Sequence, residues 1–174
     1  MRNSIPKFPD FNAAAKQFTF LMVNLPLMIG KEAENFFKDS FKNQAWEGVQ
    51  WEERKRKDKN PKRRALLVKT GRLRRSIRIR EVSFGKVVVG TDVPYAQIHN
   101  EGGIITGTQN VSAHKVRSHE RRGSRVREHQ RVAYVRTVNI AIPKRQFMGE
   151  SALLNQKVEK LIETSVNDVI KRYL

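Results

Sequence analysis

The sequence contains no cysteine among its 174 residues, so disulfides and thiolate metal sites are excluded. It also lacks a long apolar run. The longest stretch without a formal charge runs from Gln17 to Gly30, and Asn24 and Pro26 interrupt it. This stretch is shorter than the roughly 20 apolar residues that cross a bilayer. Met1 is followed by a polar segment with proline, so we expect neither a secretory signal nor a membrane partner.

Acidic residues are scarce: 17 Asp and Glu stand against 35 Lys and Arg, which gives a formal net charge of +18. Such a charge predicts acidic partners, namely nucleic acid, an anionic surface or acidic protein subunits. The length suits one domain of ordinary size, and a hydrophobic content of 39% is enough for one core. We therefore expect residues 1–174 to form a single soluble domain.

The basic charge is concentrated in segments with few apolar residues. Eight of the eleven residues from Arg54 to Arg64 are Lys or Arg, and their mutual repulsion predicts a solvated loop over 52–66. Residues 106–131 form a long basic insertion that has too little apolar content to fold by itself. Residues 1–10 are expected to form a flexible arm. The basic residues of the insertion are Lys115, Arg117, Arg121, Arg122, Arg125, Arg127 and Arg131.

Two helices are predicted near the N-terminus. Alanine and long apolar side chains favour a helix from Ala13 to Val23. Because proline cannot continue the backbone ladder but suits the first turn, we expect a break near Asn24 and a new helix after Pro26. From Leu27 to about Trp46 the apolar residues recur at helical spacing, and several are phenylalanines. This stripe is interpreted as core.

The middle of the chain predicts a short helix and a hairpin. Thr70 is expected to cap a helical turn. Alternating residues from Ile77 to Phe84 predict a half-buried strand, and Gly85 with Lys86 offers a turn into a second strand. A further helical turn is predicted from Tyr95 to Glu101, closed by Gly102 and Gly103.

The last third predicts a strand from Ala133 to Ile142 and, from Ser151, an amphipathic helix of about twenty residues. The expected fold class is thus α+β, with N-terminal helices, a small antiparallel sheet containing a hairpin, and a long C-terminal amphipathic helix.

The sequence contains only weak signals for a catalytic or metal site. His114, His119 and His129 supply three possible zinc ligands, but neighbouring cations oppose a dication. Asp39 with Glu53 and Lys55 resembles the metal-binding set of a nuclease, although a helix and a charged loop are poor supports for it. The sequence has no phosphate-binding loop with a terminal Gly-Lys-Ser/Thr and no Gly-x-Ser-x-Gly. We therefore expect no enzyme, no metal and no cofactor.

The basic clusters favour contact with phosphates, which would be independent of sequence and steeply dependent on salt. No helix-turn-helix spacing, zinc finger or aromatic-rich strand indicates specific readout. Acidic neighbouring subunits explain the same charge equally well, so genomic DNA and acidic protein partners both stay open at this point.

Three segments resemble, in order, the motif blocks of the virion morphogenesis family of tailed phages. They are Lys69 to Ile77 (KTGRLRRSI), Val89 to Gly103 (VGTDVPYAQIHNEGG) and Ile142 to Gly149 (IPKRQFMG). The matching residues are Thr70, Gly71, Leu73, Ser76, Ile77, Gly90, Thr91, Pro94, Tyr95, Ala96, His99, Gly102, Gly103, Pro143, Arg145 and Phe147. The insertion over 106–131 and the N-terminal arm depart from the family pattern.

The motif residues are interpreted as architectural. Gly71 and Gly90 would leave room for close neighbours, and Tyr95 would bury its ring and bond through its hydroxyl. His99 is expected to form a hydrogen-bonded corner rather than a catalytic base, and Phe147 to plug the junction between sheet and last helix.

The resemblance implies a structural virion protein that acts in tail completion and head–tail joining. It further implies a homo-oligomeric connector ring in the neck, a hexamer or a dodecamer, in contact with head-completion and tail-tube proteins. Assembly in the host cytoplasm would precede incorporation into the virion. Segments 1–10, 52–66 and 106–131 would order on neighbouring subunits. A sequence-independent DNA-binding protein and a metal-dependent nuclease are the alternatives.

Overall fold

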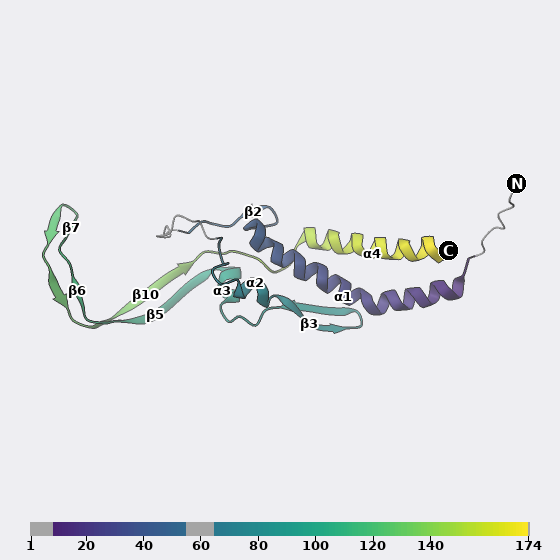
Figure 1. The fold of residues 1–174 in the computed structure, drawn as a ribbon, viewed down its shortest axis with the longest axis horizontal. Helices are drawn as coiled ribbons and strands as arrows, with labels where there is room; N and C mark the ends of the chain where they lie inside the picture. The colour runs from purple at the N-terminus through teal and green to yellow at the C-terminus, as the bar shows by residue number, and fades with distance from the viewer. Residues whose placement is uncertain (1–8, 55–64, 174) are drawn as a thin grey trace.

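The computed structural model describes residues 9–54 and 65–173 and has an α+β fold. A helical body carries a long two-stranded arm that projects away from it (Figure 1). Most of the predicted arm over 1–10 and the predicted basic loop over 52–66 lie outside the described residues. No helix in the described part of the chain has the length and apolarity needed to cross a membrane.

The first helix, α1 (Phe11–Asn43), is continuous, so the predicted break near Asn24 is wrong. Asp10 caps its start, because the Asp10 carboxylate accepts from the Ala13 amide at 2.9 Å. Pro26 lies inside the helix and removes one backbone donor. The helix tolerates this with a change of direction in its first half (Figure 1), as proline-containing helices commonly do.

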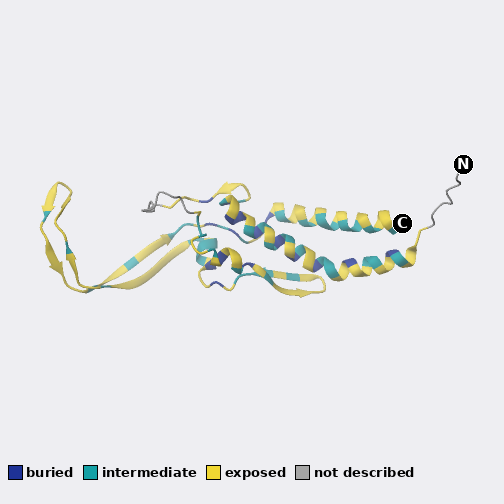
Figure 2. Cartoon of the chain, in the orientation of Figure 1, coloured by how far each residue is buried: buried dark blue, intermediate teal, exposed yellow. Residues whose placement is uncertain are grey.

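The aromatic stripe of α1 forms the core, as predicted. Phe37 and Phe41 are buried together with Ala33 on one side of the helix. The dark-blue segments of Figure 2 gather in the second half of α1 and in the segments packed against it. The rest of this buried cluster comes from Trp51, Leu73, Ile77, Val93, Ala96 and Phe147. One helix face therefore organises the whole core.

Aromatic contacts fix the centre of this core. The ring of Phe41 lies 5.0 Å from that of Phe147 and 5.5 Å from that of Trp51, measured between centroids. Phe147 is 1% exposed. The expectation that it packs internally is confirmed, since aromatic pairs at such distances add to the burial of their area.

The predicted hairpin is present as β3 (Arg78–Ser83) and β4 (Lys86–Gly90). A register shift between Ile79 and Glu81 explains the imperfect alternation in the sequence. The hairpin packs on α1 at Gly30, where an added Cβ would lie 2.6 Å from Val87 Cγ2 and 2.9 Å from Ile79 Cδ1. Glycine is needed there because helix and hairpin approach so closely.

The arm is one antiparallel hairpin with a single register from end to end. The strands β5 (Gly103–Val111) and β10 (Tyr134–Ile142) form its stem. The outer ladders pair β6 (His114–Val116) with β9 (His129–Arg131), and β7 (His119–Arg121) with β8 (Ser124–Val126). At the end, Arg122 and Gly123 have φ of 51° and 76°, the two positive values of a type I′ turn.

That segment 106–131 does not fold by itself stays a prediction, but the structure describes the segment as paired strands, which its composition did not indicate. The reason lies in the backbone. A two-residue turn and three ladders in one register pair the backbone donors and acceptors of the strands without any apolar content. Within the described residues the strands form separate two-stranded ladders rather than one sheet, the remaining pair being β1 (Ala45–Trp46) with β2 (Val49–Gln50).

The predicted C-terminal helix is α4 (Ala152–Tyr173), which runs beside α1. The Ser151 hydroxyl accepts from the Leu154 amide at 3.1 Å and donates to Glu47 Oε1 at 2.6 Å. This bond holds the pKa of Glu47 below its ordinary value. Lys157 reaches back to Glu32 of α1 at 3.4 Å. No described residue of α4 is fully buried, so the helix covers the body as a half-exposed layer.

Replacing Phe147 by alanine should lower the free energy of unfolding by about 3–5 kcal/mol, because the change leaves a cavity beside Phe41 and Trp51. Phe84→Ala is the matched control, since Phe84 is 78% exposed and should change stability by less than about 0.5 kcal/mol. Urea denaturation of both variants tests the pair. Equal losses would contradict the assigned core.

Candidate functional site

The family-type motif blocks lie in three short connections that converge on the second half of α1. The first block contains α2 (Arg72–Ser76), the second ends β4 and contains α3 (Ala96–Glu101), and the third precedes α4. The arrangement is a packed junction. Its buried members are Leu73, Ile77, Val93, Ala96, Arg145 and Phe147.

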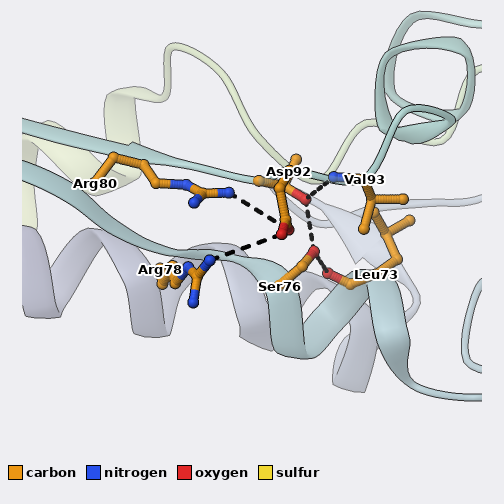
Figure 3. Close-up of polar contacts among 7 residues, drawn as sticks. Leu73, Ser76, Arg78, Arg80, Asp92 and Val93 are labelled. Carbon is orange, nitrogen blue, oxygen red and sulfur yellow. Dashed lines mark hydrogen bonds and ion pairs between the residues drawn. The ribbon is translucent and has the colours of Figure 1, made fainter.

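The first and second blocks are joined through two hydroxyl groups (Figure 3). Ser76 Oγ donates to the Leu73 carbonyl at 2.7 Å and lies 2.6 Å from Thr91 Oγ1. Since Ser76 has one proton, Thr91 is the donor between the two hydroxyls. Thr91 Oγ1 also accepts from the Val93 amide at 3.2 Å. The bonds fix the end of α2 against the turn that follows β4.

Asp92 faces the two arginines of β3 beside this junction (Figure 3). Its carboxylate lies 3.4 Å from Arg80 and 3.7 Å from Arg78. Asp92 is 56% exposed on its side chain, so solvent screens both pairs and they contribute little to stability. They orient the hairpin rather than form a reactive centre.

Asn100 joins the second and third blocks, and the sequence analysis did not single it out. Its side-chain oxygen accepts from the Phe147 amide at 2.9 Å and from the Met148 amide at 3.0 Å. Its amide group donates to the Met148 carbonyl at 3.1 Å. The signal was available, because Asn100 stands inside the block next to His99, but only the fold brings it to the third block.

Arg145 fastens the third block to the segment after β2. Its Nε and Nη2 donate to the Glu52 carbonyl at 3.1 and 2.9 Å, and its own amide donates to the His99 carbonyl at 2.8 Å. Trp51 Nε1 donates to the Gln146 carbonyl at 2.8 Å on the same side. Burial lowers the pKa of the Arg145 guanidinium, and Glu52 opposes this effect. A buried cation bonded to backbone oxygens serves position, not catalysis.

His99 and Tyr95 differ from expectation. Tyr95 is 41% exposed and lies edge-on to His99, with centroids 5.9 Å apart, so the prediction of a buried ring is wrong. His99 Nδ1 is buried without a hydrogen-bond partner in the described part of the chain, so the predicted hydrogen-bonded corner is made by its backbone alone. Burial, and then the charge of Arg145, lowers the pKa of the imidazole.

The motif glycines have different roles. Gly71, with φ of 69°, takes the N-cap position of α2 that was expected for Thr70. The Thr70 hydroxyl accepts from the Arg72 amide over a long distance of 3.4 Å. At Gly102 φ is 77° and an added Cβ would lie 2.8 Å from the Lys144 nitrogen. A Cβ added at Gly90 would meet nothing closer than Arg80 Cγ at 3.5 Å, so the expectation of crowding at Gly90 is wrong. The conformational need is at Gly71 and Gly102.

The remaining motif positions lie at the ends of the elements that carry these contacts. Gly103 has φ of 150° at the start of β5, and Pro94 and Pro143 border α3 and the third block. Among residues 9–54 and 65–173, no three His, Asp or Glu side chains come together as metal ligands. Lys55, the third member of the nuclease set, lies outside those residues.

The basic residues of the insertion form a second, separate region at the end of the arm. All seven, from Lys115 to Arg131, are exposed. The three histidines of this region each place Nδ1 2.9 Å from the carbonyl oxygen two residues earlier, so Nδ1 is the protonated nitrogen in the neutral ring. A short repeat that was not predicted occurs here, with VRSHER at 116–121 and VREHQR at 126–131. The hairpin sets its two copies side by side.

Removal of the Asn100 side chain should separate the second and third blocks. Asn100→Ala leaves two backbone amides without acceptors, and we expect the free energy of unfolding to fall by about 2–4 kcal/mol. Asn100→Asp keeps the accepting oxygen and should lose less, whereas Asn139→Ala, at an exposed site in β10, should be neutral. Urea denaturation checks the order, and a loss in Asn139→Ala as large as in Asn100→Ala would refute it.

The buried imidazole predicts acid sensitivity. The pKa of His99 is lower in the folded state than the ordinary value of 6.5, so the unfolded chain binds more protons just below that pH. Stability should therefore fall as pH drops below about 6.5. His99→Gln cannot titrate and should show a shallower loss of unfolding free energy between pH 7.5 and pH 5. The same slope in both proteins would contradict the assignment.

The chain matches the model of the phage virion morphogenesis family over residues 19–167. No curated protein and no solved structure shows significant similarity to it. The match spans all three motif blocks, both long helices in large part and the whole arm. The match covers most of the chain, so the chain belongs to the phage virion morphogenesis family.

Proposed function

We propose that this protein is a neck component of a tailed-phage virion, a non-enzymatic subunit of a homo-oligomeric ring that acts in tail completion and head–tail joining. Family membership supports the virion role. The observation that carries the finer proposal is a pair of unpartnered apolar surfaces, one on α1 and one on the stem of the arm. A subunit with two such surfaces is suited to contact two neighbours.

The first surface is on the N-terminal half of α1. Large apolar side chains at i, i+3 and i+7 share one outward face there, with Phe20 65%, Val23 63% and Leu27 42% exposed. Met22 and Pro26 line an apolar groove beside Phe84 of the hairpin turn. Monomeric proteins rarely leave such a contiguous apolar patch in water. The patch therefore indicates contact with another chain.

The second surface is one face of the stem. Ile105 of β5 lies opposite Ile140 of β10, and these side chains are 46% and 49% exposed. Val138 follows on the same face two residues away. An isolated two-stranded ribbon is marginal in water, and both edges of the stem offer unpaired backbone groups. A neighbouring subunit would cover the face and the edges together.

Charge favours a second copy of this chain as that neighbour. At +18, identical subunits repel one another unless the facing surfaces lack cations. From Gln17 to Gly30 there is no charged residue, and Arg136 is the one Lys or Arg in β5 and β10. Arg136 is bonded to Gln109 across the stem. A head-to-tail contact of stem and helix closes into a ring where its rotation permits.

Self-association should depend on the stem face. Ile105→Thr with Ile140→Thr removes apolar area but keeps strand propensity, so we expect a folded protein whose association weakens at least tenfold in analytical ultracentrifugation. Thr108→Ser with Thr137→Ser changes a cross-strand pair on the opposite face and is the matched control. Equal association of both variants would exclude the stem as the interface.

The joining role is tested in the phage. An early stop codon in the gene should give filled heads beside separate tails in electron micrographs of the lysate, because only the joint is missing. Complementation with the control pair should restore joined particles, and the isoleucine variant should not. Normal joined particles without the protein would refute the proposal.

A further inference from the structure

The end of the arm, residues 114–131, is a charged ribbon that the joining role does not use. Every residue in it is exposed except Val116 and Val126, which are half-buried. It points away from the helical body (Figure 1), and Figure 2 shows it almost entirely exposed. Nothing in the described chain neutralises it from outside.

The cations of the ribbon end are distributed evenly. In the ladder β6–β9, Lys115 lies opposite Gln130 and Arg131 opposite His114; in β7–β8, Arg125 lies opposite Glu120 and Arg121 opposite Ser124. Four of the six paired rungs hold a Lys or Arg, and the other two hold a histidine. Because neighbouring rungs point to opposite faces, both faces of the ribbon are positive.

Internal neutralisation is slight. The segment has two acidic residues, Glu120 and Glu128, for seven Lys and Arg. In the described part of the chain Lys115 pairs with Glu128 at 2.6 Å. Arg131 stacks over the ring of Tyr134 at 4.9 Å, which holds it at the base of the ribbon end. Most of the guanidinium groups remain turned to solvent.

We infer that the end of the arm is a binding site for double-stranded DNA that recognises the phosphate backbone irrespective of sequence. A two-stranded ribbon has a width that the major groove admits. The rungs follow one another at about 3.4 Å along the ribbon, close to the rise of each DNA strand, so the cations that four of them hold can contact several phosphates at once. The tip carries Arg122 in a two-residue turn, which adds a cation at the leading point.

An acidic protein is the other class of partner, and the ribbon fits it less well. Protein interfaces place apolar or aromatic anchors at their centre. The segment from His114 to Arg131 has no aromatic residue and only two valines. Cations on both faces also suit a partner that surrounds the ribbon, as the walls of a groove do, better than a single flat surface.

The test compares two variants of the full chain with equal loss of charge. The arm variant carries Arg121→Gln, Arg122→Gln, Arg125→Gln and Arg127→Gln. The control carries Lys16→Gln, Lys160→Gln, Lys171→Gln and Arg172→Gln, which are exposed residues of α1 and α4. Binding to a random-sequence 30-base-pair duplex is measured by fluorescence anisotropy over a range of salt concentrations.

The arm variant should bind at least tenfold more weakly than the control at low salt. Its plot of log affinity against log salt should be shallower than that of wild type by about 3.6, since four phosphate contacts at about 0.9 each are removed. The control should keep a slope near that of wild type. Equal weakening of both variants would show that net charge alone binds DNA and would overturn the proposal.

An acidic protein partner gives a different result. In that case the arm variant keeps its affinity for DNA but is not incorporated into virions, which also overturns the proposal. Analytical ultracentrifugation of the same variant separates this site from the ring interface, because the stem residues are unchanged and self-association should match wild type. Circular dichroism confirms that both variants are folded.

Discussion

The burial of Phe41 against Trp51 and Phe147 is the interaction on which the rest of the protein depends. These three rings come from α1, from the segment after β2 and from the third motif block, so the contact joins residues far apart in the chain. Directed bonds then fix the connections around it. Asn100, Arg145 and Trp51 each bond to the backbone of another segment, which fixes the relative positions of the three motif blocks.

Much of the fold follows from local sequence signals. The aromatic stripe, the Gly85 turn and the apolar period after Ser151 each identify an element, because periodicity and turn chemistry act over a few residues. The prediction of a helix break near Asn24 is wrong because Pro26 removes only one backbone hydrogen bond from a helix that continues on both sides of the proline. The arm was missed because its strands satisfy one another rather than a core, and composition carries no sign of such pairing.

The contacts of the candidate site, too, could be predicted from the sequence only in part. Burial of Leu73, Ile77 and Phe147 could be expected from apolar residues in short blocks. The role of Asn100 could not, since its partners stand 47 and 48 residues away, and neither could the exposure of Tyr95, which depends on how α3 sits on its neighbours. The contacts of a polar side chain are hard to predict from sequence, because the same residue type can cap a helix, bond two segments together or lie in solvent.

The single register of the arm also bears on the order in which the chain folds. Pairing can start at the Arg122 turn and proceed rung by rung, and each step closes only a short loop. When Gly103 pairs with Ile142, the residues that follow α3 and those that begin the third block lie on adjacent strands. The contact of Trp51 with Gln146, 95 residues apart in sequence, then closes a much shorter effective loop. Pairing of the arm thus lowers the loop-closure entropy that is lost when the core assembles.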